Sequence, residues 1–282
     1  MAPMTTGPGA AEKRRLDLEL VARGLAPSRT VAKVDIEAGL VSVDGAVVTK
    51  SATKVDPAQS LTVHRDERPY VGRAGIKLAA GLDAFGIDAA GARCIDAGAS
   101  TGGFSDCLLR RKAASIVAVD VGTGQLHPSI RGHERVNVRE QTDIRSLQNA
   151  DVGGPVDLVV VDLSFISLRN VLPALAPLVD SGGSLLVLVK PQFEAGRKAV
   201  AAGRGVIREP SLWRRVLIEV TSAASELGLS LRGATVSPIT GASGNVEFMV
   251  WFQPAGPPTA IERVRGETMI EAAVAEAETR IS

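Results

Sequence analysis

Residues Arg93 to Phe104 read Arg-Cys-Ile-Asp-Ala-Gly-Ala-Ser-Thr-Gly-Gly-Phe, an apolar run that ends in a carboxylate and passes into a glycine-rich turn. Val117 to Gly122, Val-Ala-Val-Asp-Val-Gly, repeats the pattern of a strand followed by an acid. In nucleotide-binding sheets an acid about 20 residues beyond the glycine turn takes the ribose hydroxyls. The pair Asp96 and Asp120 therefore predicts a nucleoside cofactor, against the plainer alternative of a strand, a turn and a surface acid.

The acid in the turn decides between two classes of cofactor. Asp96 would repel the pyrophosphate of a dinucleotide, and the Gly-x-Gly-x-x-Gly pattern is absent. S-adenosylmethionine has no phosphate, and a carboxylate favours its sulfonium and ammonium groups. Glycines would let the chain approach it closely. We therefore expect S-adenosylmethionine at this turn. The predicted contacts within the turn are Asp96, Gly98, Ser100, Gly102, Gly103 and Phe104.

The amino-acid composition limits the number of domains and the class of protein to which this chain can belong. The chain has 282 residues, of which 45% are hydrophobic, enough for one large domain and one small one. The net charge is only +1, so any nucleic-acid surface must be local. No run reaches the roughly 18 apolar residues that span a bilayer, and the first residues lack the apolar core of a signal peptide. We expect a cytoplasmic protein. The two cysteines and three histidines suggest no metal site.

The first 65 residues predict a tail and a small α+β unit. Residues 1–13 are rich in Gly, Pro, Ala and Thr and are expected to be disordered. A short helix should close near Gly24, and Ser28 is a suitable N-cap for a second helix through Ala38. Asp44-Gly45 between alternating residues is a strong hairpin signal. We assign residues 14–65 to this domain and 66–75 to a linker.

Residues 76–256 alternate between helix and strand, which predicts a mainly parallel, doubly wound α/β sheet with its ligand at the carboxyl edge. The last two strands are joined by too short a segment for a crossover helix and should pair antiparallel. Such a seven-strand sheet resembles the Rossmann-like methyltransferase fold. A terminal helix should follow within residues 257–282. The predicted strands are 92–95, 115–119, 135–138, 157–161, 183–188, 230–236 and 246–252, and the main helices are 75–85, 103–112, 168–179 and 210–227.

Four ionisable residues stand at ends of predicted elements, namely Lys77, Asp162, Lys190 and Glu247. Methyl transfer to a ribose 2′-hydroxyl suits this set, because a very weak acid must lose its proton as its oxygen attacks. We expect Lys190 to be the base, since an apolar strand end and the second cation Lys77 both favour an uncharged amine. Lys77 should also stabilise the developing oxyanion, and the two acids should orient the lysines.

Five segments, in the same order within about residues 14–252, closely resemble the TlyA family, also called haemolysin A proteins. They are Gly72–Leu78, Asp96–Phe104, Asp162–Ser167, Lys190–Glu194 and Gly244–Glu247. Members join a small RNA-binding module to an FtsJ/RrmJ-like methyltransferase domain. The resemblance implies 2′-O-methylation of ribosomal RNA, commonly at cytidine, and it places the four ionisable residues on the family's catalytic tetrad.

The N-terminal unit resembles the small RNA-binding module that members of this family carry. Leu20–Gly24, Ala26–Arg29, Ala38–Val41 and Val43–Gly45 are similar to the RNA-binding module named after ribosomal protein S4. In that module the second helix presents basic residues to RNA. The residues expected to bind RNA are Arg14, Arg15, Arg29 and Lys33, with support from Arg23, Lys50 and Lys54. Ribosomal RNA or ribosomal subunits are the expected partners, and a solvated charged surface is the plainer alternative.

Three positions depart from the family pattern. Gly72-Arg73-Ala74-Gly75 replaces Ser-Arg-Gly-Gly, and Thr123 stands where an aromatic usually follows Asp-Val-Gly. Asp143 replaces a usual Asn, which changes a hydrogen-bond donor into an acceptor near the cofactor base. Asp120 and Asp143 complete the expected cofactor contacts.

Three other functions are weighed against this enzyme. A membrane-acting haemolysin would need a spanning or lipid-binding segment, whereas the terminal helix carries Glu271, Glu276 and Glu278. A non-catalytic ribosome-assembly factor would not need the cofactor turn and the four ionisable residues. A dinucleotide oxidoreductase would not place Asp96 in the turn.

Overall fold

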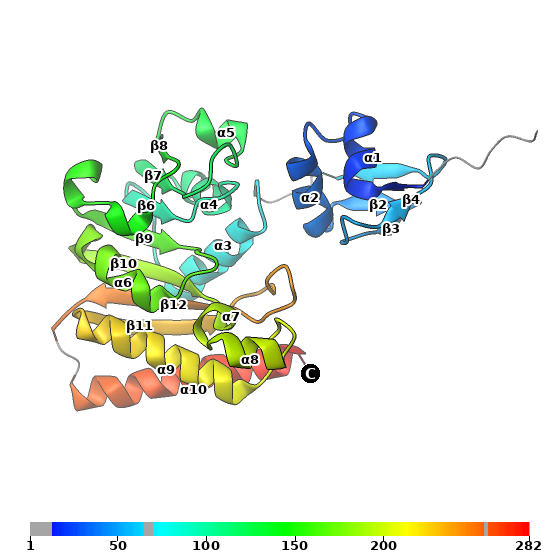
Figure 1. The fold of residues 1–282 in the computed structure, drawn as a ribbon. Coiled ribbons are helices and arrows are strands. Elements are labelled where there is room, and N and C mark those ends of the chain that lie inside the picture. The colour runs from blue at the N-terminus through cyan, green and yellow to red at the C-terminus, as the bar shows by residue number, and fades with distance from the viewer. Residues whose placement is uncertain (1–12, 65–69, 257–258, 282) are drawn as a thin grey trace, which may run out of the picture. The chain divides into compact units, whose positions relative to one another are not determined.

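The computed structural model describes residues 13–64, 70–256 and 259–281. The chain divides into two compact units, residues 1–69 and 70–282 (Figure 1). Nearly all of the expected disordered tail, and residues 66–69 of the expected linker, lie outside the described residues.

The first unit has two helices and two small antiparallel sheets. Its elements are β1 (Arg14–Arg15), α1 (Leu16–Ala22), α2 (Arg29–Glu37), β2 (Val41–Val43), β3 (Ala46–Val47), β4 (Lys54–Val55) and β5 (Leu61–Val63). Ser28 caps α2 by accepting a hydrogen bond from Val31 N at 3.3 Å, as its sequence position predicts. Asp44 and Gly45 have φ of 50° and 83°, the left-handed pair that a two-residue hairpin turn requires. The predicted helices and hairpin are therefore confirmed.

The second unit is built on a seven-stranded sheet in the order β11-β12-β10-β9-β6-β7-β8 (Figure 1). The strands are β6 (Arg93–Ala97), β7 (Ser115–Val119), β8 (Val136–Arg139), β9 (Val156–Val161), β10 (Val179–Val189), β11 (Leu229–Val236) and β12 (Phe248–Pro254). β12 pairs antiparallel with both β10 and β11, and the other pairs are parallel. This is the predicted methyltransferase-type sheet.

Helices cover both faces of the sheet, so its central strands are apolar on both sides. Along β9, Val159 and Val161 belong to one buried cluster, and Leu158 and Val160 belong to the other. The second cluster includes residues of α3 (Ala74–Phe85) and α4 (Gly103–Arg110), and the first includes residues of α9 (Pro210–Glu226) and α10 (Ala260–Ile281). The continuous apolar runs in the sequence thus reflect strands covered by helices on both faces.

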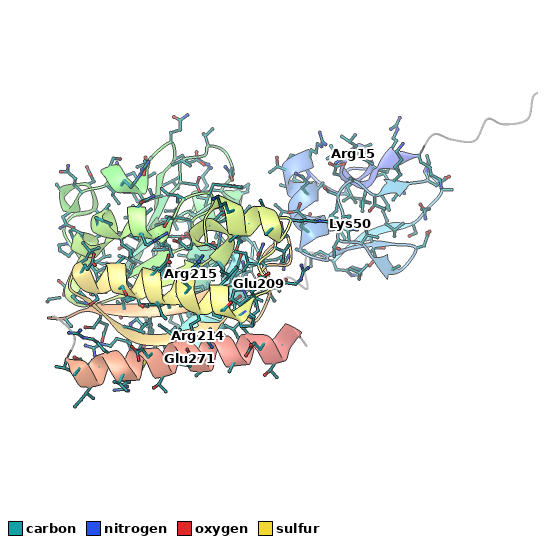
Figure 2. All side chains as sticks on the ribbon, turned by 60° about the horizontal axis from the view of Figure 1, so that its bottom comes forward. Arg15, Lys50, Glu209, Arg214, Arg215 and Glu271 are labelled. Carbon is teal, nitrogen blue, oxygen red and sulfur yellow. The ribbon has the colours of Figure 1, made fainter. Side chains whose placement is uncertain are left out.

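The terminal helix α10 belongs to the second unit's core. It packs against β11 and α9 (Figure 1), and its Ile270, Ala273 and Val274 are buried in the same cluster as the sheet. Arg214 of α9 and Glu271 of α10 face each other as an ion pair (Figure 2). Within the described residues, no helix combines the length and apolar character needed to cross a membrane.

One predicted helix is wrong in part. Residues 168–179 form three short turns, η4 (Leu168–Asn170), α6 (Leu172–Leu175) and η5 (Ala176–Leu178), because Pro173 and Pro177 interrupt a continuous helix. Val179 already begins β10. Three short helices follow strands or loops without having been predicted: α5 (Pro128–Arg131), α7 (Pro191–Glu194) and α8 (Arg197–Ala202).

Candidate active site

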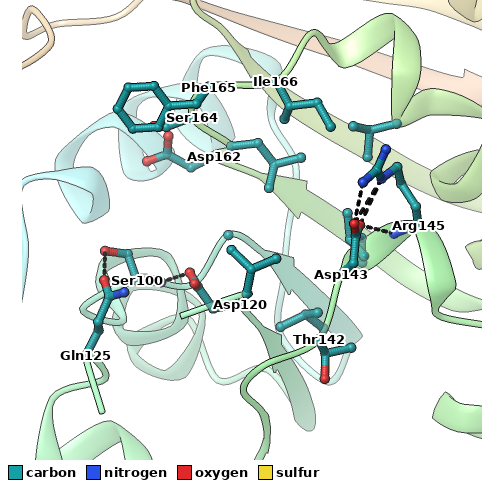
Figure 3. A pocket seen from close by; sticks show the side chains of 16 residues that line it. Ser100, Asp120, Gln125, Thr142, Asp143, Arg145, Asp162, Ser164, Phe165 and Ile166 are labelled. Carbon is teal, nitrogen blue, oxygen red and sulfur yellow. Dashed lines mark hydrogen bonds and ion pairs between the residues drawn. The ribbon is translucent and has the colours of Figure 1, made fainter. Parts of the chain in front are cut away.

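A cavity of about 460 Å³ opens where β6, β7, β8 and β9 end (Figure 3). This is the carboxyl edge of the sheet, where a fold of this class binds its ligands. Its lining includes Gly98, Ser100, Asp120, Gln125, Asp143, Arg145, Asp162, Leu163, Ser164 and Phe165. The structure therefore brings together acids that lie far apart in the sequence.

The glycine turn forms one wall of this cavity. Gly98 has φ of 89°, and a Cβ there would lie 2.5 Å from the Asp162 carbonyl oxygen, so no larger residue fits between the ends of β6 and β9. Ser100 also has a positive φ, 47°, and its N–H donates to Asp120 Oδ2 at 2.8 Å. Asp120 Oδ1 accepts from Gly122 N at 2.7 Å. The backbone thus holds the Asp120 carboxylate at the cavity, in the place expected for a ribose contact.

Asp96 lies beside the cavity without being part of its lining. Its side chain is completely buried, and Oδ2 accepts a hydrogen bond from Ser105 Oγ at 2.7 Å. Oδ1 is buried without a hydrogen-bond partner among the described residues. Burial, reinforced by repulsion from Asp162 and Asp120, raises the pKa of Asp96 to about 7. A cationic group at this edge of the sheet would relieve that cost.

Three other predicted contacts lie away from the cavity lining. Phe104 is buried in the core cluster that includes α3 residues, because the first turn of α4 faces that helix. A Cβ on Gly103 would lie 3.0 Å from Gly75 N, and one on Gly102 would lie 3.1 Å from side-chain atoms of Leu126 and Ile130. These two glycines pack closely against neighbouring residues, and the assignment of these positions and of Phe104 to cofactor binding stays a prediction.

Asp143 lines the opposite wall and is held by Arg145. The Arg145 backbone N–H donates to Asp143 Oδ1 at 2.9 Å, and the guanidinium Nη2 donates to Oδ2 at 2.5 Å. These hydrogen bonds lower the pKa of Asp143. The carboxylate is a fixed acceptor beside the cavity (Figure 3), in line with the predicted change from a donor to an acceptor at this position.

Lys190 and Asp162 form an ion pair at the edge of the cavity. The distance between Lys190 Nζ and Asp162 Oδ1 is 2.7 Å, and Nζ also donates to Ser164 Oγ at 2.9 Å. Lys190 is 9% exposed. Asp162 and Ser164 both line the cavity (Figure 3), so the Lys190 amine contacts two side chains of its wall.

Lys77 and Glu247 form a second, more buried pair. Lys77 Nζ donates to Glu247 Oε2 at 2.5 Å, and their side chains are 9% and 3% exposed. The antiparallel register of β10 and β12 ends at Val189 opposite Phe248, and Lys190 and Glu247 are the next residues at this same end of the two strands. The four predicted tetrad residues are therefore two ion pairs at one edge of the sheet.

Sequence reasoning missed several residues around this centre. Phe165 is 92% exposed with φ of 65°, and its ring centroid lies 5.1 Å from that of Phe193. Lys190 Nζ lies 5.8 Å from the centroid of the Phe193 ring. Ser164 and Phe165 lie in the segment Asp162–Ser167, whose resemblance to the family was a signal, but the sequence assigned neither residue a role. Gln125 lies in a loop and Arg145 in the short helix η2 (Ile144–Ser146), and no local pattern assigns either residue to a site.

The expected RNA-binding residues lie in the first unit. Arg14 and Lys33 are exposed. Arg15 and Arg29 are partly exposed and pair with the buried Asp17. Within the described ranges no group of three or more His, Cys, Asp or Glu side chains is placed to hold a metal ion.

Comparisons with known proteins agree with this architecture. The model of the FtsJ-like methyltransferase family matches residues 70–254, and that of the S4 domain matches residues 14–60. The chain is 50% identical to the 16S/23S rRNA (cytidine-2′-O)-methyltransferase TlyA of Mycobacterium tuberculosis, over 86% of this chain and 91% of that protein. It is 36% identical to Hemolysin A of Brachyspira hyodysenteriae, over 84% of this chain and 99% of that protein.

A solved structure gives the same result for the fold. A protein from Streptococcus thermophilus, described as a candidate hemolysin, superimposes with a TM-score of 0.73 at 37% identity. The match covers 95% of this chain and 98% of that one.

Proposed function

The chain belongs to the FtsJ-like methyltransferase family, in its TlyA branch with an N-terminal S4 domain, and from this premise we propose that it methylates the 2′-hydroxyl of a ribose, at cytidine, in ribosomal RNA. The observation that carries the proposal is the Lys190–Asp162 pair at the wall of an acid-lined cavity. A ribosomal RNA substrate would place the protein in the cytoplasm, where ribosomes are assembled.

The charges of the cavity fit S-adenosylmethionine as the methyl donor. The lining contains Asp120, Asp143 and Asp162 but only one cation, Arg145. Such a wall repels a pyrophosphate and favours a ligand that carries positive charge. Asp96 Oδ1, buried and unpartnered, adds a further acceptor at the same edge. We assign the ribose hydroxyls to Asp120, the adenine edge to Asp143, and the positive charge of the cofactor to the field of Asp96 and Asp162.

When bound, S-adenosylmethionine supplies an electrophilic methyl group on a sulfonium. The chain's own task is to remove the proton from the attacking 2′-oxygen. Lys190 takes this proton in its unprotonated form, and Asp162 stabilises the ammonium that results. Asp162 and Ser164 each occupy one direction around Nζ, and we assign the remaining direction to the substrate hydroxyl.

Lys77 completes the charge arrangement. Glu247 holds it at 2.5 Å, and Glu247 and Lys190 follow the last paired positions of β12 and β10 at the same end, so a second ammonium is held at the end of the strands where the base lies. A fixed cation stabilises negative charge that develops on the 2′-oxygen at little reorganisation cost. The arrangement therefore separates two roles, proton removal at Lys190 and charge stabilisation at Lys77.

The target base has an aromatic surface available. Phe165 is nearly fully exposed at the cavity and packs against Phe193, which also contacts Lys190. Bases of single-stranded or splayed-out RNA nucleotides commonly stack on such rings. We assign Phe165 to stacking of the target base, and Phe165→Ala should raise the KM for RNA by about tenfold, since base stacking contributes roughly 1–3 kcal/mol. Phe165→Tyr, which keeps the ring, is the matched control.

The proposal is tested by locating 2′-O-methyl groups in ribosomal RNA with mass spectrometry. Cells that express the unchanged protein should gain a ribose methylation that cells without it lack, and Lys190→Ala should remove it. An identical methylation pattern with and without the protein would contradict the proposal.

The haemolysin alternative has weaker support. On α10, Ile270, Ala273, Val274 and Ala277 are buried in the core cluster that includes residues of β11 and α9, whereas Ile261 and Val264 near its start are exposed. The relative named Hemolysin A spans the same two-domain length as this chain, so its sequence similarity is equally consistent with a methyltransferase.

A further inference from the structure

The first unit contains one acid that two arginines share. The side chain of Asp17, on α1, is completely buried. Its Oδ1 accepts from Arg15 Nε at 3.0 Å, and its Oδ2 accepts from Arg15 Nη2 at 3.0 Å and from Arg29 Nε at 2.9 Å. The hydrogen bond from Arg15, with that from Arg29, lowers the pKa of Asp17 to about 2. Two guanidinium groups, from β1 and from α2, are thereby fixed on one carboxylate.

The outward edges of both guanidinium groups stay available. The side chains of Arg15 and Arg29 are 38% and 56% exposed. The bonds to Asp17 leave Nη1 of Arg15 and both Nη atoms of Arg29 as donors. The planar fork of arginine matches a phosphate in geometry as well as in charge. The arrangement thus presents two guanidinium groups that are both held by the carboxylate of Asp17.

A third cation lies next to this pair. In the ladder of β1 and β4, Lys54 lies opposite Arg15, and its side chain is exposed. Among residues 13–64 no acidic side chain lies within 4.0 Å of the Lys54 ammonium. Like charges directly opposite each other on paired strands are unfavourable. A bound anion would relieve that repulsion. Arg15 is labelled in Figure 2.

A second acid on the same helix provides a contrast. Glu19 accepts from Arg23 Nε at 2.8 Å, but Arg23 also donates to the carbonyl oxygens of Gln59, at 2.7 Å, and Pro57, at 2.9 Å. Arg23 thus connects α1 to the loop before β5, and its guanidinium group is hydrogen-bonded within the domain. The expected support of Arg23 for RNA binding stays a prediction.

We propose that Asp17 is a positioning residue that holds Arg15 and Arg29 as one receptor for a phosphate of the RNA backbone. The inference rests on the proposed function, because it names the part of the S4 domain that contacts the substrate. Its physical basis is preorganisation: side chains that are already fixed lose less freedom when the phosphate binds.

The test is Asp17→Asn in the full chain, with binding of 23S ribosomal RNA measured by filter retention over a range of salt. Charge counting alone predicts tighter binding, because the variant gains one positive charge. Positioning predicts the opposite: binding about five- to tenfold weaker, with the salt slope reduced by about one phosphate contact. Glu19→Gln makes the same change in net charge on the same helix and should bind RNA at least as tightly as the unchanged protein.

Two further variants keep the proposal testable if Asp17→Asn disturbs folding. Arg15→Lys and Arg29→Lys preserve charge but lose the fork, so each should weaken RNA binding severalfold. Methylation by either variant should recover near-normal kcat at saturating RNA, with the loss appearing in KM. Wild-type RNA affinity in both lysine variants, or Asp17→Asn binding as tightly as Glu19→Gln, would overturn the inference alone. Absence of salt-dependent RNA binding by the unchanged protein would overturn the proposed function with it.

Discussion

Asp17 and Asp96 are the same residue type, both completely buried, yet the protein moves their acidities in opposite directions. In the first unit, Asp17 accepts hydrogen bonds from two arginines, and its pKa falls to about 2. In the second unit, the side-chain partner of Asp96 among the described residues is a serine hydroxyl, and burial raises its pKa to about 7. Burial disfavours a charged carboxylate, and paired cations outweigh that effect.

The lysine pairs beside the cavity show a third arrangement. Asp162 and Glu247 each hold one ammonium, and their side chains are 14% and 3% exposed. Arginine keeps its proton in proteins, whereas lysine can lose it. Under the proposed function only Lys190 has to exchange a proton, which a lysine can do, whereas Arg15 and Arg29 at Asp17 keep their charge.

The largest expected effect is the loss of methylation activity when Lys190 is replaced. Lys190→Ala should lower kcat by about 10²–10⁴-fold, the contribution of a general base. Lys190→Arg should be equally inactive, because a guanidinium keeps its proton although it can still pair with Asp162. Single-turnover methylation and calorimetry of S-adenosylmethionine binding check this, and binding should stay near wild type in both variants.

Substantial activity in Lys190→Arg would show that the residue acts only as a charge. The base would then have to be another group. A wild-type rate that rises with pH, against a flat profile in the arginine variant, would support proton transfer to Lys190.

The second effect concerns the stability of the buried pair. Glu247→Gln should lower the free energy of unfolding by about 3 kcal/mol, because it leaves the Lys77 ammonium buried without a counter-charge. Urea unfolding measures this. Glu276→Gln, which breaks the exposed pair with Arg280 on α10, should cost at most about 1 kcal/mol. Equal losses in the two variants would mean that the Lys77–Glu247 pair is not electrostatically different from a surface pair.

The third prediction concerns how the buried carboxyl group of Asp96 makes the stability of the folded chain depend on pH. The pKa of Asp96 is about 7 in the folded chain and near 3.8 in an ordinary environment. Between these values the folded state holds a proton that the unfolded state has lost, so the contribution of Asp96 to stability falls as pH rises from about 4 to 7. Asp96→Asn should remove this slope, on the order of a few kcal/mol.

Urea unfolding at pH 5 and pH 8, in the wild type and in Asp96→Asn, checks this prediction. The variant should be relatively more stable at pH 8. A parallel pH dependence in the two proteins would show that Asp96 is already ionised when folded. The same substitution should weaken S-adenosylmethionine binding if the carboxylate's field acts on the cofactor.

The smallest effect concerns Asp17, which is paired with two arginines. Its contribution to stability changes with pH in the opposite direction to that of Asp96. The pKa of Asp17 is lowered, so its contribution to stability is present above pH 3.8 and is lost as pH falls through about 2. Amide hydrogen exchange of α1 and α2 at pH 5 and pH 2.5 should show this loss in the wild type. Asp17→Asn should lack it, whereas Glu19→Gln should retain it; equal acid sensitivity in all three would contradict the assignment.

Much of this protein was predictable because the signals are local. The Asp44-Gly45 turn, the Ser28 cap and the alternating strand and helix pattern each depend on residues close in sequence, and the structure confirms them. The positions of Lys190 and Asp162 were predictable for a related reason. Parallel strands place their carboxyl ends at one edge of the sheet, so strand-end residues meet whatever the loop lengths.

Other features were decided only by tertiary packing. Nothing local shows that Phe104 turns into the core, that Ser164 approaches Lys190, or that Arg145 fixes Asp143 at the cavity. The sharing of Asp17 between Arg15 and Arg29 depends on how β1, α1 and α2 pack together. The sequence by itself determined the elements and the edge at which the chemistry gathers. Only the packed structure decided which charges are buried, which are paired and which stay available to a ligand, because burial and distance between remote residues set those energies.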